Sequence, residues 1–380
     1  LPKDWDGNPH YIVVPMLPVF EWHEDKVNQP MADQITRDLR GFMEHRGSGT
    51  LITHDMLFQS WYLTHAKALH QLGQVDGWNI VHVMHSIPSR PSDLTDTDPR
   101  QARCSLPEGH KLACLSHSAA VGVAGAYQTD LENIYVLPNA FDLLDWYGAT
   151  RKVRHLVEDN DLLNADVIQT YPISMPRMGA KGLLDLMWIF AAMKKAGASV
   201  RLIIADAHGS DDLRDEVRTA ATAMKLNHDV IFATDYIGDR DIGVGRSDLR
   251  VLMQLSNLFI FPSRSEACPL TLMEAAWSGN LLVLNSSLPV MKDLVGSAGV
   301  LWYPFGTTLR APKKLNADEI AENILATLRS DDMHRVRKAL IRHTGVPQVG
   351  AMLKTIHGVN ADHKSLAHRV NGGTVEEPVE

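Results

Sequence analysis

Short apolar runs alternate with amphipathic stretches along most of the chain. Apolar runs of about four to eight residues with polar, glycine or proline flanks predict buried strands. We expect such strands at 11–16, 50–55, 78–85, 111–117, 134–137, 166–171, 200–205, 229–233, 258–261 and 281–284. Apolar positions spaced by three and four residues predict helices. We expect these at 31–45, 56–72, 118–127, 183–195, 212–225, 247–255, 269–277, 316–329 and 333–343.

This regular alternation of strands and helices determines the expected fold class. Strands that alternate with helices form parallel sheets, so the pattern predicts an α/β protein. A length of 380 residues predicts two to three domains at about 150 residues each. The alternation is interrupted at 145–163, which we interpret as a linker and bridging helix. We therefore expect two Rossmann-like doubly wound domains, 1–150 and 151–345, facing a cleft.

Composition excludes several other classes of protein. The chain is 45% hydrophobic and 22% charged, which is ordinary for a globular protein, and it has no apolar run of about 18 residues that would predict a membrane span. The net charge of −8 does not indicate nucleic-acid binding, although it leaves room for a local basic cleft. Cys104, Cys114 and Cys268 lack metal-ligand spacing. Their number and the lack of a signal-peptide pattern predict a cytoplasmic protein.

One stretch, 258–279, combines a strand, a polar loop and a helix. The apolar run 258–261 stops at Pro262, which cannot continue a central ladder. Helical spacing begins near Pro269 and ends at Gly279. In an open parallel sheet this arrangement places the loop at the carboxyl end of a strand, where such folds bind ligands.

Two glutamates occupy this stretch. Glu266 lies in the loop and Glu274 follows eight positions later on the expected helix. The first helical turn, at Leu270 and Thr271, offers unpaired N–H groups and the positive end of the helix dipole. This combination suits a phosphate group.

A second loop, 172–182, carries basic residues ahead of a helix. Arg177 offers a planar fork of donors and Lys181 offers a point charge. Because the loop contains glycines and precedes a helix start, these residues are placed well to clamp a diphosphate.

Histidines and aspartates supply weaker signals in the first half. His54 and His85 both fall at carboxyl ends of expected strands, whereas His82 lies within a strand and is interpreted as structural. Asp96 and Asp98 form an Asp-x-Asp sequence of the kind that binds a divalent cation, but proline-rich flanks favour a solvated loop. We therefore expect no metal site.

The segment from Pro262 to Gly279 resembles the retaining nucleotide-sugar glycosyltransferases of the GT-B type, in the group 1 or family 4-like set. Those enzymes carry two glutamates separated by seven residues after a proline-serine pair. The resemblance implies that Glu266 contacts the donor sugar and that Glu274 holds the ribose. It also implies that Arg177 and Lys181 hold the donor diphosphate.

The resemblance extends to other residues and to the reaction. It implies a GT-B fold in which residues 346–380 form a C-terminal helix and tail that pack back toward the first domain. His85 is expected to contact the donor sugar. From its place at the carboxyl end of the expected strand 229–233, Tyr236 is expected to border the base, and the helix dipole near Leu270 and Thr271 is expected to stabilise the leaving group. The catalytic set is thus Glu266, His85, Arg177 and Lys181. The donor is a nucleotide diphosphate sugar, and neither cofactor nor metal is expected.

Departures from the family pattern leave alternatives open. Pro176 precedes the arginine, and Ala140 replaces a glycine that family members have after the strand matching 134–137. A nucleotide-sugar epimerase or hydrolase of the same fold, or a catalytically silent subunit, therefore stays possible. The acceptor hydroxyl is open as well: a lipid, a glycan, a small molecule, a protein or a modified nucleic-acid base.

Overall fold

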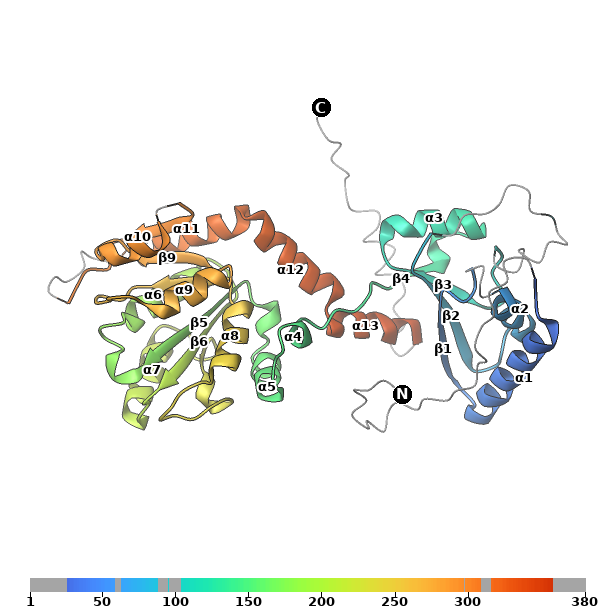
Figure 1. The fold of residues 1–380 in the computed structure, drawn as a ribbon, viewed down its shortest axis with the longest axis horizontal. Helices are drawn as coiled ribbons and strands as arrows, with labels where there is room; N and C mark the ends of the chain where they lie inside the picture. The colour runs from blue at the N-terminus through green and yellow to red at the C-terminus, as the bar shows by residue number, and fades with distance from the viewer. Residues whose placement is uncertain are drawn as a thin grey trace, which may run out of the picture. The chain divides into compact units, whose positions relative to one another are not determined.

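The computed structural model describes residues 26–58, 63–87, 95, 104–296, 298–308 and 316–357, with the backbone alone at 343, 344 and 346–348 (Figure 1). The chain divides into two compact units: unit 1 comprises 1–141 and 346–380, and unit 2 comprises 142–345. The expected strand at 11–16, the Asp-x-Asp sequence and the tail beyond 357 lie outside the described residues. No helix among the described residues is long and apolar enough to cross a membrane.

Unit 1 contains a four-stranded parallel sheet in the order β1-β2-β3-β4. Its strands are β1 (Gly49–His54), β2 (Trp78–Met84), β3 (Lys111–Cys114) and β4 (Ile134–Val136). Its helices are α1 (Gln29–Arg46), α2 (Leu63–Leu72), α3 (His117–Tyr127) and α13 (Val346–His357). Side chains alternate between the two faces of the sheet, as the strand period of two requires.

The C-terminal helix α13 covers one face of that sheet (Figure 1). Val349 and Ile356 pack against Val81 and Val83 of β2, whereas Ile80 of the same strand packs on the opposite face with residues of α1 and α2. Unit 1 therefore needs a segment more than 200 positions downstream to complete its core.

Unit 2 contains two three-stranded parallel sheets, β5-β6-β7 and β10-β9-β8. The strands are β5 (Val167–Ser174), β6 (Val200–Ala207), β7 (Val230–Phe232), β8 (Leu258–Phe261), β9 (Leu281–Asn285) and β10 (Val300–Tyr303). The helices are α4 (Leu143–Trp146), α5 (Arg151–Asp159), α6 (Leu183–Lys195), α7 (Asp211–Ala223), α8 (Arg246–Leu255), α9 (Leu270–Trp277), α10 (Pro289–Val295), α11 (Ala317–Ser330) and α12 (Asp332–Thr344). Both units are thus α/β with parallel sheets, which confirms the predicted fold class.

Side-chain amides join the two sheets of unit 2 along a seam between β5 and β8. Gln169 donates from Nε2 to the Ile260 carbonyl at 2.9 Å and accepts the Ile260 N–H at 2.9 Å. Asn257 accepts the Ile168 N–H and donates to the Asp166 carbonyl, both at 2.8 Å. Later residues on the β8 side contact later residues of β5, so the two strands run parallel. The combined strand order of unit 2 is therefore β7-β6-β5-β8-β9-β10. From β5 the chain continues to β6 and β7 on one side of the seam, and from β8 it continues to β9 and β10 on the other side. The strand order therefore reverses at the seam, which makes the seam a topological switch point.

Three elements differ from the sequence-based expectation. Residues 56–58, which we expected to be helical, form a turn: Asp55 takes a left-handed backbone (φ 56°) and its carboxylate accepts the His85 N–H at 2.8 Å, and the structure describes α2 from Leu63. The expectation also lacked α10 and β10. Both are short, with seven and four residues, and periodicity carries little signal over such lengths.

Candidate active site

Lys181 and Glu266 meet at the switch point of unit 2. Lys181 follows β5 and Glu266 follows β8, and their side chains form an ion pair. The pair is largely shielded from water, since the side chains are 16% and 9% exposed. Ser263 donates its hydroxyl to the same Glu266 oxygen at 2.5 Å. The Lys181 ammonium also lies 5.3 Å from the centroid of the Phe261 ring.

The loop before α6 holds Lys181 through its own backbone. Tyr171, fully buried in β5, donates its hydroxyl to the Lys181 carbonyl at 2.5 Å. The Lys181 N–H donates to the Arg177 carbonyl at 2.9 Å. Burial raises the pKa of Tyr171 well above its ordinary value, and the charges of Glu266 and Asp185 raise it further. The phenol therefore stays protonated and acts as a permanent donor to this loop.

The loops that carry Lys181 and Glu266 touch each other directly. Gly182 has a left-handed backbone (φ 69°), and a Cβ there would lie 2.8 Å from the Pro262 carbonyl oxygen. The Arg264 N–H donates to the Ala180 carbonyl at 2.9 Å. Only glycine permits this approach, so Gly182 fixes how closely the two segments pack.

A buried asparagine anchors the proline-serine segment from behind. Asn285, at the end of β9, donates to the carbonyls of Ser263 at 2.9 Å and Gly306 at 2.6 Å. Its oxygen accepts the N–H groups of Ser287 and Phe305, both at 3.0 Å. All four hydrogen-bonding positions of this amide are satisfied, so it supports the loop rather than offering atoms to a ligand.

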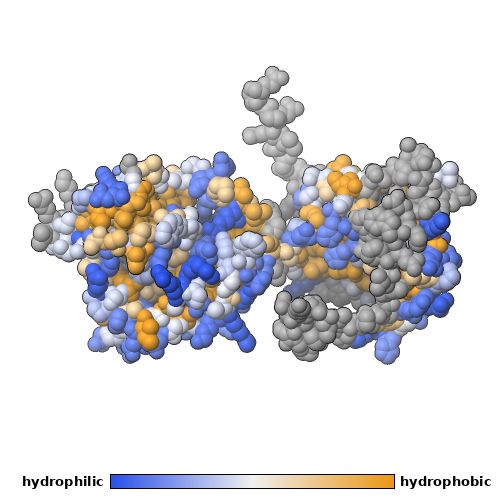
Figure 2. Space-filling view, viewed as in Figure 1, coloured by the Kyte–Doolittle hydropathy of each residue, from blue (hydrophilic) through white to orange (hydrophobic). Residues whose placement is uncertain are grey.

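Helix α9 begins beside the Glu266 loop without a side-chain cap. Pro269 stands at its N-cap position and supplies no capping oxygen, and Leu270 is 60% exposed. No side chain caps the N–H groups of the first turn, at the positive end of the helix, and the N–H of Leu272 donates to the Pro269 carbonyl at 3.2 Å. Figure 2 shows apolar residues gathered over α9 and α10 on the visible face of unit 2, and Trp277 at the far end of α9 is also exposed.

The other residues of unit 2 predicted for this site do not pair with Lys181 or Glu266. Glu274 on α9 lies 3.8 Å from a guanidinium nitrogen of Arg246, and the side chain of Arg177 is exposed. Among the described residues, no hydrogen bond or ion pair joins the side chains of Arg177, Glu274 or Tyr236 to either member of the Lys181–Glu266 pair.

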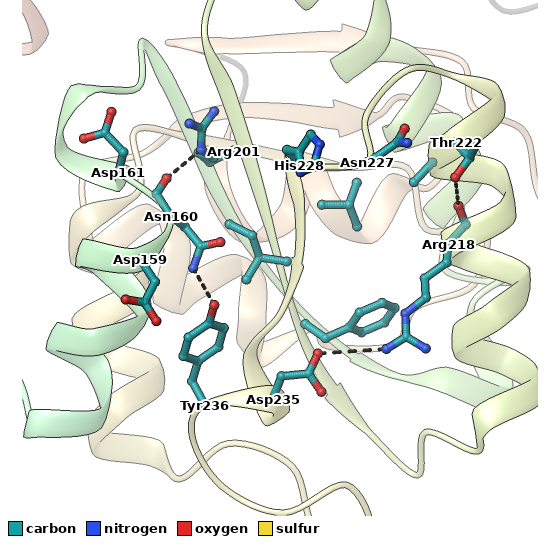
Figure 3. Close-up of a pocket in the computed structure, with 14 residues that line it drawn as sticks. Asp159, Asn160, Asp161, Arg201, Arg218, Thr222, Asn227, His228, Asp235 and Tyr236 are labelled. Carbon is teal, nitrogen blue, oxygen red and sulfur yellow. Dashed lines mark hydrogen bonds and ion pairs between the residues drawn. The ribbon is translucent and has the colours of Figure 1, made fainter.

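Tyr236 lines a pocket of about 550 Å³ along the edge strand β7 (Figure 3). Its hydroxyl accepts a hydrogen bond from Asn160 at the end of α5, at 3.2 Å. The floor of the pocket is β7, and the opposite wall is α7 with Arg218 and Thr222. Tyr236 therefore faces the edge of the sheet, next to its carboxyl end.

A buried charge network, absent from the sequence-based expectation, holds the loop after β7. Arg214 on α7 is fully buried and pairs with Asp206 at 3.2 Å and Asp235 at 2.5 Å. Its guanidinium carbon lies 4.2 Å from the centroid of the Phe232 ring. Asp235 immediately precedes Tyr236, so this network fixes the segment that carries the tyrosine. An arginine on the apolar side of an amphipathic helix was the available sequence signal.

His54 and His85 form a direct pair at the carboxyl edge of the sheet in unit 1. Nδ1 of His54 lies 2.8 Å from Nε2 of His85. Burial lowers the pKa of His54 and the charge of His85 lowers it further, while Asp55 acts in the opposite direction. The pair therefore resists a second positive charge.

His82 belongs to a separate buried chain, in agreement with its structural interpretation. The Gly73 carbonyl accepts from His110 Nε2 at 2.9 Å, so His110 Nδ1 is left to accept from His82 Nε2 at 2.9 Å. His82 Nδ1 then accepts the Thr53 hydroxyl at 2.7 Å. Both rings are neutral in this arrangement, and burial, with the charge of His110, lowers the pKa of His82 to about 3.

A cluster of at least three His, Cys, Asp or Glu side chains suited to a metal ion does not occur among the residues that the structure describes.

Residues 169–343, from β5 through α12, match the family model described as glycosyl transferases group 1. The match includes both loops of the Lys181–Glu266 pair. The protein is therefore a glycosyltransferase, as the motif in 262–279 predicted.

Solved structures similar to this chain are also glycosyltransferases by their descriptions. A glycosyltransferase from Rickettsia africae is 13% identical, with a TM-score of 0.37, and the alignment covers 90% of this chain and 85% of that one. HepE of Anabaena, solved with UDP-glucose, is 18% identical (TM-score 0.35; 87% and 84% covered). An α,α-trehalose 6-phosphate synthase from Burkholderia multivorans is 15% identical (TM-score 0.38; 92% and 77% covered). These scores are too low to assign a shared substrate. Comparison with curated proteins gave no match.

Proposed function

We propose that the protein transfers a sugar from a nucleotide diphosphate sugar to a hydroxyl acceptor with retention of the anomeric configuration. The observation that carries the proposal is the Lys181–Glu266 pair at the switch point of a sheet whose sequence matches group 1 glycosyltransferases. One member suits a phosphate and the other suits sugar hydroxyls, so adjacent halves of such a donor would meet opposite charges.

The chemical problem is charge separation. Breaking the bond between sugar and phosphate leaves a diphosphate anion and an oxocarbenium-like sugar. Lys181, Arg177 and the first-turn N–H groups of α9, at Leu270 and Thr271, would stabilise the anion. Glu266 would orient the sugar through its hydroxyls.

Other residues would bind the rest of the donor. Glu274 would hold the ribose and Tyr236 would border the base, while His85 would contact the sugar from unit 1. Because Lys181 and Arg177 supply positive charge, we propose that the transfer needs no metal ion. The acceptor proton would pass to the departing phosphate, so no side chain is assigned as general base.

The test is release of free nucleotide diphosphate from a panel of UDP, GDP and ADP sugars. Wild type should turn over one donor, and Glu266→Ala, Glu274→Ala and Lys181→Ala should each lose that turnover. Glu322→Ala, an exposed glutamate on α11, is the matched control and should behave as wild type. Chelation with EDTA should leave the rate unchanged, and NMR should show the donor anomer in the product.

Two other outcomes would replace the proposal. Turnover that yields only free sugar or an epimerised donor, at a rate independent of any acceptor, would indicate a hydrolase or an epimerase. Absence of both turnover and thermal stabilisation by every donor would indicate a catalytically silent subunit.

A further inference from the structure

Arg264 and Asp185 form a second ion pair between the two loops of the site. Nη2 of Arg264 lies 2.8 Å from Oδ2 of Asp185, which stands in the first turn of α6. Arg264 comes two positions before Glu266, and Asp185 comes four positions after Lys181. The pair therefore joins the same two segments that Lys181 and Glu266 join.

This pair lies mostly out of solvent. The side chains of Arg264 and Asp185 are 28% and 19% exposed, and the Nε of Arg264 is buried without a hydrogen-bond partner. Burial raises the pKa of Asp185, and the charge of Arg264 opposes that shift. Burying two charges at the cost of one unsatisfied donor contributes little net stability. Stability of the fold is thus a poor explanation for the pair.

Three polar contacts join the two loops. Lys181 pairs with Glu266, the Arg264 N–H donates to the Ala180 carbonyl at 2.9 Å, and the Arg264 side chain reaches Asp185. When a donor binds, its diphosphate would attract Lys181 and its sugar would attract Glu266. Their mutual contact would then weaken. The packing of Gly182 on Pro262 would then limit how closely the loops approach, and the Arg264–Asp185 pair and the backbone bond would keep them from separating.

We propose that Arg264 and Asp185 are positioning residues that hold Lys181 and Glu266 at the spacing the donor requires while the donor is bound. This inference rests on the proposed function of the Lys181–Glu266 site. Neither Arg264 nor Asp185 needs to touch the donor. Their effect would be transmitted through the loop backbone to the two residues that do.

The first experiment measures kcat and KM for the donor in Arg264→Ala, Arg264→Lys and Asp185→Asn. Loss of the pair should lower kcat/KM by roughly 10- to 100-fold, because small misplacement of reacting groups has effects of that size. Arg264→Lys retains the charge and should recover some of the loss. Asp318→Asn is the matched control: it removes an exposed pair with Lys195 on the same helix α6 and should stay within about 2-fold of wild type.

A double-mutant cycle separates positioning from general destabilisation. Donor affinity is measured by calorimetry for Arg264→Ala alone, Glu266→Gln alone, and both together. If Arg264 acts through Glu266, its effect on the dissociation constant should fall below about 2-fold in the Glu266→Gln background. Fully additive effects would overturn the inference.

A readout that needs no turnover tests the same claim. The rate at which acetic anhydride modifies Lys181 can be followed by mass spectrometry in folded protein, with Lys195 as an internal reference. Arg264→Ala and Asp185→Asn should each raise the Lys181 rate at least about 3-fold, because the loops separate more readily. Unchanged Lys181 rates in both variants would overturn the inference, even if wild type proved inactive toward every donor and the proposed function failed. If Arg264→Ala does not fold, the results for Arg264→Lys and Asp185→Asn still determine whether the inference holds.

Discussion

Lys181 and Glu266 stand 85 positions apart in the chain and share a single ion pair across the seam of unit 2. Each neutralises the charge of the other. A nucleotide diphosphate sugar would present an anionic group and a hydroxyl-rich group to the same place. Binding would thus exchange one internal contact for two external ones, and the site would respond to the whole donor more strongly than to either half.

Glu266→Gln should separate affinity for product from turnover. The amide removes a negative charge beside the diphosphate position and leaves the Lys181 ammonium without its internal partner. We expect free nucleotide diphosphate to bind several-fold more tightly, while turnover of the donor falls by roughly 100-fold or more. Calorimetry gives the affinity and nucleotide release gives the rate. Glu322→Gln on α11 is the control, and weaker nucleotide binding by Glu266→Gln would contradict the assignment of Lys181 to the phosphate.

Three glycines allow the contact between the loops to be tested in isolation. Gly182→Ala should cost about 2 kcal/mol or more, because a Cβ there meets both a left-handed backbone and the Pro262 carbonyl oxygen at 2.8 Å. Gly197→Ala has the left-handed backbone (φ 91°) but open space, and should cost only about 1 kcal/mol. Gly179→Ala has neither constraint and should be close to neutral. Urea unfolding of unit 2 measures all three, and equal costs at 182 and 197 would show that the close approach is unimportant.

The buried histidine chain should make unit 1 less stable in acid. The folded-state pKa of His82 is about 3, whereas its unfolded value is near 6.5, so the unfolded chain binds a proton first as the pH falls. His110 shifts in the same direction, mainly through burial. Stability is therefore complete above about pH 6.5 and decreases below it, by about 2 kcal/mol between pH 7.5 and 5 for His82 alone.

Hydrogen exchange in urea, read on peptides of β2, measures this loss specifically for unit 1. His82→Gln should flatten the dependence on pH, whereas His155→Gln, an exposed histidine on α5, should not change it. A wild-type unit 1 that is equally stable at pH 5 and 7.5 would contradict the neutral tautomers assigned to the chain.

The amide seam predicts a large effect from one polar residue within an apolar strand. Gln169→Leu would leave both the N–H and the carbonyl of Ile260 unpaired in the interior of unit 2. At about 1–3 kcal/mol for each unpaired group, we expect a loss of about 3 kcal/mol. Thermal and urea unfolding measure it, with the exposed Gln34→Leu on α1 as control. A neutral Gln169→Leu would mean that the two sheets need no side-chain link.

The sequence was informative where position along a strand determines position in space. Lys181 and Glu266 follow different strands, and parallel strands bring their carboxyl ends to one edge, so their proximity was predictable. The partners of Arg264 and Gln169 were not. A polar residue within an apolar run signals a buried hydrogen bond, but its partner depends on which strands lie side by side. Short elements such as β10 were also not predicted, because four residues are too few to distinguish the hydrophobic period of a strand from that of a helix.

The seam between β5 and β8 also determines how the two sheets of unit 2 are held together. A backbone ladder would draw these strands together along their whole length and close the sheet at its centre. Hydrogen bonds from the side chains of Gln169 and Asn257 instead link the two three-stranded sheets at separate points along the seam. Substitution at position 169 would consequently change the spacing between β5 and β8, and with it the positions of the loops that follow them, as well as the stability of unit 2.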